Sequence, residues 1–349
     1  MEARSDRGGF FREILRTAAE VAHEVGAAVR PPGSPWSAAE PETEPSVEPR
    51  PVPAEPVRHD ASLDNLSRLC QAVGLGARLA EVRALARRSL RLTLAGTQTS
   101  PLGGSRLGGA PDLPPGFRWP TWNGEELVFL GQIRLEDVTA VDPTASLPAE
   151  GLLLLFYDTI GQPSGLDPAH RGSCRVILYE GDTSLLEPAP EQGWFIEQPV
   201  ELSLELTLPR SSSMLVEQLD LEFAEGEAWE MLRERLAQLQ GVELEERGVG
   251  TLALHRLLGH PEERRPRMEL ECQLASRGID LSEGAGDVDP RAEQLEPGAS
   301  EWRLLVQLSS DDEVGFYWGD GLGRLYVWIR ERDLVERDTA AAWALLEQL

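Results

Sequence analysis

Residues 200–208 read Val-Glu-Leu-Ser-Leu-Glu-Leu-Thr-Leu, and this stretch decides the fold class. Every second residue is valine or leucine, and the residues between them are glutamate, serine or threonine. A period of two is typical of a β-strand that packs one face on a core and turns the other to solvent, as in antiparallel sheets. The stretch therefore predicts a half-buried antiparallel strand.

Further strands and helices are predicted on both sides of this stretch. Residues 89–94 alternate in the same way, and short apolar runs bounded by Gly, Pro or Asp predict strands at 127–133, 152–157, 175–180, 268–273, 302–308 and 324–330. Apolar residues at helical spacing predict helices at about 63–86, 227–239 and 338–349. Because strands outnumber helices and do not alternate strictly with them, we expect an α+β fold of mostly antiparallel sheets with a few flanking helices.

The N-terminal region is expected to differ from the rest of the chain. Residues 1–30 contain an amphipathic pattern that predicts a helix, and Pro31-Pro32-Gly33 ends it. Residues 31–60 are rich in proline and glutamate and predict a disordered tether, because they cannot bury enough apolar surface to offset the entropy of ordering. Residues 61–349 then form the main domain. The helix either folds back on it or binds a partner; its balanced charges argue against a membrane as the target.

Charge excludes several functions. The net charge is −26, all 33 basic residues are arginine, and residues 96–349 alone carry the full excess of 26 negative charges. Without lysine there is no Walker-type phosphate site and no Schiff-base lysine. A strongly acidic body repels nucleic acid and anionic lipid, so we expect no nucleic-acid binding and a cationic protein partner instead.

Cysteine spacing and hydropathy bear on the compartment. Cys70, Cys174 and Cys272 are about a hundred residues apart, which favours reduced, buried thiols over disulfides or a CxxC site. No apolar run approaches the ~20 residues of a membrane span, and the N-terminus does not resemble a secretory signal. We expect a cytoplasmic protein without a cofactor.

Three groups of motifs carry a family resemblance. They are Ser-Arg-Leu-Gly-Gly-Ala-Pro-Asp-Leu-Pro at 105–114 with Leu-Gly-Gln-Ile at 130–133, His-Arg-Leu-Leu-Gly-His-Pro at 255–261, and Trp-Arg-Leu-Leu-Val-Gln-Leu at 302–308 with Trp-Gly-Asp at 318–320. Together they resemble the YwqG-like family, a bacterial domain of unknown function, from about residue 62 to the end. The resemblance implies a mixed α+β fold and no established activity.

The same motifs contain an internal echo. Two sets recur in the same order, Gly109-Ala110-Pro111, Gln132 and Gly151 in the first and Gly259-His260-Pro261, Gln307 and Gly323 in the second. A duplicated unit and a chance likeness explain this recurrence equally well. Both glutamines lie in apolar strands, so we expect them to hydrogen-bond backbone across the sheet.

The best candidate site combines carboxylates with tryptophans. Asp311, Glu313 and Asp320 lie with Trp318 between two apolar strands, and could meet at a sheet edge to bind a ligand or partner. The alternative is a solvated hairpin with Asp320-Gly321 at its turn. Trp119 is a further candidate, and we expect it to lie over the glycine turn at 108–109.

A metal site is the weaker possibility. His255, His260 and Cys272 could hold zinc if the chain folded back, but the two histidines are not at helical spacing, so structural histidines are favoured.

Two hypotheses of function follow. The first is a non-enzymatic interaction protein whose acidic body and N-terminal helix bind a cationic partner, with an immunity or antitoxin protein as a subtype. The second is a small-molecule-binding protein or a metal-assisted hydrolase that uses the carboxylates near Asp320.

Overall fold

The structure is a computed structural model, and it describes residues 59–96, 99–189, 193–242, 244, 254–282, 289–319 and 321–348. The chain divides into two compact units, residues 1–53 and 54–349, of which the first lies outside the described residues. The expected N-terminal helix also lies outside them, as does the tether except for His59 and Asp60, which begin helix α2 (His59–Ala72).

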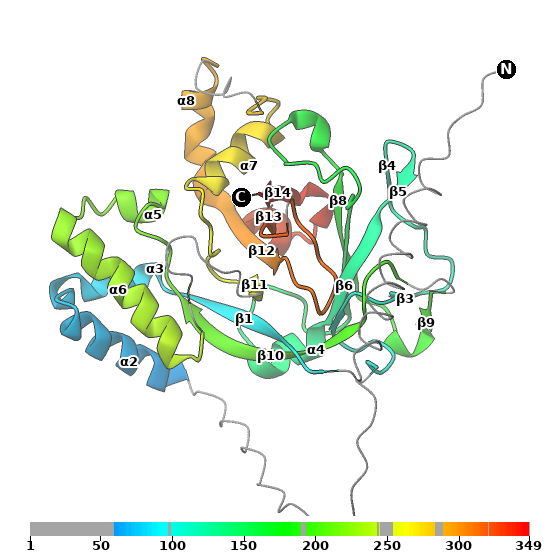
Figure 1. Ribbon diagram of the computed structural model, residues 1–349, viewed down its shortest axis with the longest axis horizontal. Coiled ribbons are helices and arrows are strands. Elements are labelled where there is room, and N and C mark those ends of the chain that lie inside the picture. Colours follow the sequence, from blue (N-terminus) through cyan, green and yellow to red (C-terminus); the bar gives the residue numbers. More distant parts are fainter. Residues whose placement is uncertain are drawn as a thin grey trace, which may run out of the picture. The chain divides into compact units, whose positions relative to one another are not determined.

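The fold is α+β and is built on one ten-stranded antiparallel sheet (Figure 1). The strand order is β14-β13-β12-β11-β1-β10-β2-β6-β7-β8. The strands are β1 (Arg87–Leu94), β2 (Arg106–Leu107), β6 (Val128–Arg134), β7 (Leu152–Tyr157), β8 (Cys174–Tyr179), β10 (Gln198–Thr207), β11 (His255–Leu258), β12 (Trp302–Ser309), β13 (Arg324–Arg330) and β14 (Trp343–Glu347). Two small ribbons lie beside it, β3 (Asp112–Leu113) with β9 (Glu187–Pro188), and β4 (Thr121–Trp122) with β5 (Glu125–Glu126).

Residues 200–207 of the alternating stretch lie in the central strand β10. It pairs with β1 along eight residues, from Arg87↔Thr207 to Leu94↔Val200. The predicted alternation fails at two positions, because Glu205 and Thr207 are buried rather than solvated. The hydroxyl of Thr207 donates to the Arg87 carbonyl at 3.1 Å. The Glu205 carboxylate accepts a hydrogen bond of 2.8 Å from Arg256 Nε, which compensates the burial of the charge.

The two halves of this sheet repeat each other. Counted outward from the centre, β10-β2-β6-β7-β8 on one side matches β1-β11-β12-β13-β14 on the other. Arg106 pairs with Gln132 as Arg256 pairs with Gln307, so the motifs 106–112 and 256–262 occupy the same register. In chain order β1 precedes the first half and β10 the second, which means that the halves have exchanged their leading strands. The exchange joins both halves in one sheet.

The two halves also share equivalent hydrogen bonds, made by Gln132 in one half and Gln307 in the other. Gln132 Oε1 accepts from the Asp112 amide at 2.9 Å, and Gln307 Oε1 accepts from the Glu262 amide at 2.8 Å. The Nε2 atoms donate to the carbonyls of Gly104 and Leu254, at 3.0 and 3.1 Å. The expected role of both glutamines as cross-sheet partners of the backbone is confirmed, and the sequence echo corresponds to a structural repeat.

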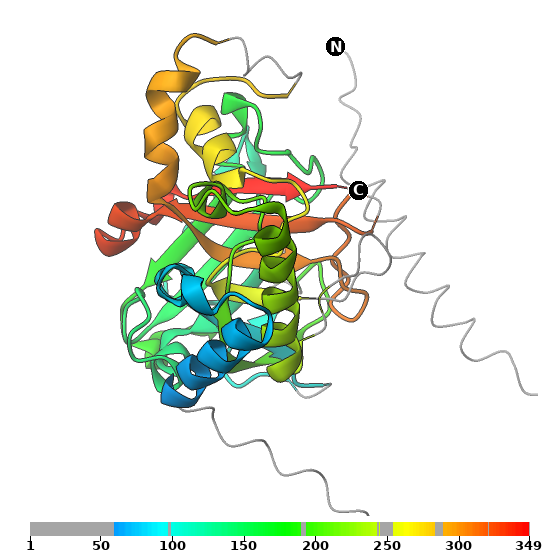
Figure 2. The ribbon, with the colours of Figure 1, turned by 90° about the vertical axis from the view of Figure 1, so that its left-hand side faces the viewer.

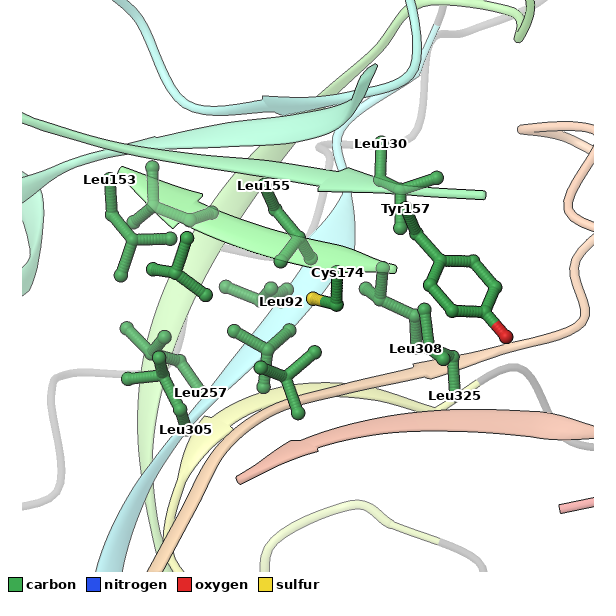
Figure 3. Close-up of a cluster of buried hydrophobic side chains, with 14 of the residues drawn as sticks. Leu92, Leu130, Leu153, Leu155, Tyr157, Cys174, Leu257, Leu305, Leu308 and Leu325 are labelled. Carbon is green, nitrogen blue, oxygen red and sulfur yellow. The ribbon is translucent and has the colours of Figure 1, made fainter. Parts of the chain in front are cut away.

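The sheet curves around one large apolar core. Side chains of β6, β7 and β8 meet those of β11, β12 and β13 there, and Figure 3 shows Leu153 and Leu155 opposite Leu257, Leu305 and Leu308. The interior is filled by side chains in the way of a small closed barrel rather than left open.

Helices cover the outside of the sheet (Figure 2). Helices α2, α3 (Leu79–Leu85) and α6 (Phe223–Leu239) enclose a second apolar cluster with Trp229 and Leu232 at its centre. The remaining helices are the short elements α4 (Leu135–Val141), α5 (Met214–Glu217), α8 (Ala292–Leu295) and α9 (Glu331–Val335), together with α7 (Met268–Ser276).

Two sequence predictions were wrong. Residues 268–273 belong to helix α7 and not to a strand; Met268, Cys272 and Ala275 pack at helical spacing on the outer face of the sheet. The C-terminal segment is strand β14 and not a helix, because Trp343–Glu347 pairs along β13 and all five residues are buried. Tertiary pairing overrides the weak local preference in both cases.

Candidate partner-binding surface

The connection between β12 and β13 contains the residues that the sequence singled out. Asp311 and Phe316 form an isolated antiparallel bridge, with both N–H···O distances at 2.9 Å. Asp311 Oδ1 also accepts a hydrogen bond from the Glu313 amide at 2.8 Å. These contacts make a compact hairpin of residues 311–316. The hairpin expected from the sequence had its turn at Asp320-Gly321 instead, and it stays a prediction because Asp320 lies outside the described residues.

A buried histidine anchors this hairpin to the sheet. His255 Nε2 lies 3.0 Å from Asp311 Oδ2, and both side chains are buried. Burial alone would raise the pKa of Asp311, but its hydrogen bonds and charge interaction with His255 outweigh burial and lower it. Asp311 is therefore ionised, and His255 donates its Nε2 proton to it. The pair is closed off from solvent and holds the hairpin in place.

Two other loops pack against the hairpin, one on each side. Gln162 Nε2 donates to the Tyr317 carbonyl and Gln162 Oε1 accepts from the Gly319 amide, both at 2.8 Å. On the other side the Ile196 amide donates to the Val314 carbonyl at 2.9 Å. Loops 158–162 and 193–198 are thus joined through residues 311–319.

These three loops expose a group of large apolar side chains. Ile160, Ile196 and Tyr317 are 62%, 59% and 60% exposed. We call the group the hairpin surface and define it as Ile160, Trp194, Ile196, Tyr317 and Leu322 with the exposed carboxylates of Asp312 and Glu313. It lies at the end of β13 opposite to α9, where Figure 2 shows the orange β12–β13 connection.

The other predicted site residues do not join this surface. Trp318 is fully buried in the large core, 6.0 Å from the Tyr157 ring, and Trp119 packs 5.3 Å from the Phe156 ring in a separate cluster. The expectation that Trp119 lies over the glycine turn was wrong: its Nε1 donates to the Leu127 carbonyl at 2.7 Å. Asp320 lies outside the described residues.

Comparison with known proteins assigns the chain to a family. The family model described as a domain of unknown function, DUF1963, matches residues 105–347, which is more than half of the chain. The chain belongs to the DUF1963 family. No curated protein matches it. The match begins at the repeat motif of β2 and ends in β14, so it covers both halves of the repeat except for strand β1.

The zinc candidates of this DUF1963 protein are not brought together. His260 Nε2 bonds the Leu85 carbonyl at 2.7 Å, and burial, with Arg87 nearby, lowers its pKa well below the usual value. Cys272 is buried in α7, where burial raises its pKa. Among the residues that the structure describes, no group of three His, Cys, Asp or Glu side chains could hold a metal ion.

A small polar cavity between α6 and β10 was not foreseen from the sequence. Its volume is about 20 Å³, enough for roughly one water molecule. Glu205, Arg233, Arg256 and Glu262 line it, and Arg233 Nη2 donates to Glu262 Oε2 at 2.8 Å. Burial opposes ionisation of Glu262, but Arg233 and Arg210 lower its pKa to about 2. The charged groups that line the cavity already have partners within the DUF1963 domain, because Arg233 and Arg210 pair with Glu262 and Arg256 pairs with Glu205.

Three glutamates near the start of α7 form a second unforeseen group. Glu263 and Glu269 each have a buried carboxylate oxygen that accepts no hydrogen bond among the described residues, and Glu271 Oε2 lies 3.1 Å from Arg265 Nη2 as an ion pair. Burial raises the pKa of all three, and that of Glu271 reaches about 7. No sequence signal marked them, because their burial depends on how α7 lies on the sheet.

Proposed function

We propose that this DUF1963 protein is a non-enzymatic interaction module whose acidic body binds a cationic protein partner. The charge distribution is the observation that carries the proposal. Residues 96–349 hold the whole excess of 26 negative charges. A surface of this kind attracts positively charged partners and speeds their encounter.

Few of these excess negative charges are buried inside the protein. Among the described residues, eight carboxylates and five arginines are buried, so the interior removes a net of only three negative charges. The buried arginines are paired internally, as in Arg106–Asp112 at 2.9 Å and Arg256–Glu205 at 2.8 Å. Most of the negative charge therefore remains available to a partner.

The proposal also covers the family subgroup, the subtype of function and the cellular location. The motifs that resemble the YwqG-like family support that name as a subgroup, and an immunity or antitoxin protein that masks a basic toxin is the subtype that fits an acidic, non-catalytic body. Three free, buried cysteines agree with a cytoplasmic location. The described residues contain no helix long and apolar enough to cross a membrane.

Affinity capture from the native host tests the proposal. We expect the full chain to retain a specific basic protein at low salt and to release it as salt rises, because the Debye length falls. A chain lacking residues 1–60 separates the contribution of the N-terminal segment from that of the body. Capture of no specific basic protein by either chain at low salt contradicts the proposal.

The alternative, a small-molecule-binding protein or metal-assisted hydrolase, stays a prediction. Its residues are dispersed: Glu313 is exposed, Trp318 lies in the core, and His255 is closed off with Asp311. Elemental analysis and a thermal-shift metabolite screen test it, and a bound metal or a reproducible shift would favour it over the interaction module.

A further inference from the structure

We infer that the hairpin surface is the docking site for a partner segment in which apolar side chains are interleaved with arginine or lysine. The inference rests on the proposed function and locates it on the molecule. Its first ground is the concentration of apolar surface. Five of the eleven large hydrophobic side chains exposed in the described part of the chain lie on the three loops of this surface. Single exposed apolar residues are ordinary, whereas an adjoining group marks an interaction site.

The second ground is charge. Residues 158–166, 193–198 and 310–323 contain six carboxylates and no arginine. Of these, Asp312 and Glu313 are exposed on the same hairpin as Tyr317. Arg264 reaches only the edge, where its Nη1 donates to the Leu322 carbonyl at 3.0 Å. Guanidinium groups form strong pairs with carboxylates and also stack on aromatic rings such as Tyr317.

The third ground is preorganisation. The Phe195 and Phe316 rings pack edge to face at 4.8 Å, which fixes the loop before β10 on the hairpin. Gln162 fixes the opposite loop through its two hydrogen bonds, and His255 fixes the hairpin itself. A surface that is ordered before binding loses less entropy when it binds.

Charge also argues for the occupant. A second copy of this chain would bring two bodies, each with a large excess of carboxylates, into contact at an acidic surface, and like charges opposed across an interface are costly. A basic segment instead neutralises Asp312 and Glu313 while its apolar side chains cover Ile196 and Tyr317.

The test compares two short fluorescein-labelled peptides of equal charge, one alternating leucine with arginine and one alternating serine with arginine. The full-length protein is expected to bind the leucine peptide about tenfold or more tightly than the serine peptide. In the double variant Ile196→Ser/Tyr317→Ser, the leucine peptide is expected to lose about tenfold in affinity and the serine peptide to be unchanged, since only the former uses apolar contacts. Asp312→Asn/Glu313→Gln should weaken both peptides and reduce the dependence on salt.

A matched control is Phe223→Ser on α6, where the side chain is 83% exposed and lies outside the hairpin surface. It should leave both affinities unchanged. Unfolding midpoints of all variants are compared with that of the parent protein, because substitutions of exposed side chains change stability little.

Each outcome has a defined meaning. If the parent binds the leucine peptide but the hairpin variants bind it equally well, or Phe223→Ser weakens it as much, the docking site is wrong while the proposed function stands. If neither peptide binds at low salt, the proposed function fails as well. If sedimentation shows a dimer that Ile196→Ser/Tyr317→Ser abolishes, the occupant is a second copy and the inference is overturned.

Discussion

Glu271 offers a direct test of the electrostatics of this fold. Its carboxylate lies on α7, 3.1 Å from Arg265 Nη2, and its side chain is 20% exposed. Burial raises its pKa to about 7 from an ordinary value of 4.5; Arg265 opposes the shift, and Glu347 and Glu269 reinforce it. Between these two values the folded protein holds a proton that the unfolded chain has released. The free energy of unfolding therefore falls as pH rises through this window.

The magnitude follows from the size of the shift. The difference between a pKa of about 7 and one of 4.5 corresponds to at most about 3 kcal/mol, since a tenfold change in an equilibrium constant is roughly 1.4 kcal/mol. In Glu271→Gln the side chain keeps its shape but cannot ionise, so the free energy of unfolding no longer falls with rising pH through this group. The pKa of about 7 already includes the ion pair with Arg265, and the partial exposure of the Glu271 side chain reduces the figure to about 2 kcal/mol. We expect the variant to be more stable than the parent by about 2 kcal/mol at about pH 8, and to lose this advantage at about pH 5.

Urea unfolding followed by tryptophan fluorescence at both pH values measures the difference. The matched control is Glu293→Gln, an exposed glutamate on the neighbouring helix α8, which should shift neither curve. Glu263 and Glu269 act in the same direction as Glu271, so part of the pH dependence should persist in the variant. A stability difference that is the same at both pH values would refute the reasoning.

Three further predictions follow from the repeat and the core. Gly151→Ala should lower the free energy of unfolding by more than about 2 kcal/mol, because φ is +113° and a Cβ would lie 2.0 Å from the Tyr179 carbonyl oxygen; chemical denaturation measures this. Gln307→Leu should cost about 1–3 kcal/mol in the same assay, since it leaves the buried Glu262 amide without its acceptor, while the Leu254 carbonyl keeps its hydrogen bond from Ser309 Oγ. The three cysteines should be inert to a thiol reagent in the native protein and react with it fully in urea, because all are buried.

The sequence predicted elements best where local pattern and tertiary environment agree. Strands β7 and β13 were predicted at the ends observed, because their continuous apolar runs are bounded by Gly151 and Gly323, which come too close to a neighbouring carbonyl to carry a side chain. The segments 268–273 and 343–347 were mistaken for the opposite element. Their composition suits either a helix or a strand. Packing across the sheet decides for the helix at 268–273, and pairing with β13 decides for the strand at 343–347.

The candidate site was predicted only as far as its position in the chain. The sequence located the hairpin through Asp311 and Glu313, but Ile160 and Ile196 lie more than a hundred residues earlier and carry no motif. They join the hairpin because the sheet curves around the core and Gln162 reaches Tyr317. Trp318 was misjudged for the reverse reason: a tryptophan next to acidic residues looks like a surface group, yet its ring packs in the large core beside Tyr157 and Phe316.

The repeat also decides how the buried His255–Asp311 pair should be interpreted. His255 precedes Arg256 as Ser105 precedes Arg106, so the two residues occupy equivalent positions in the two halves. Ser105 Oγ donates to Asp137 Oδ2 at 2.8 Å, and Asp137 lies in α4 on the connection that follows β6. His255 meets Asp311 at 3.0 Å on the connection that follows β12.

In both halves, the residue before the paired arginine (Ser105 or His255) thus contacts an aspartate in the connection that follows the next strand. Because serine performs the same task in the first half, the imidazole of the second half needs no catalytic role to account for its position. What differs between the halves is the connection that is held: helix α4 in one and the exposed hairpin in the other. A site that evolved after duplication is expected where the two halves diverge, and the hairpin surface is such a place.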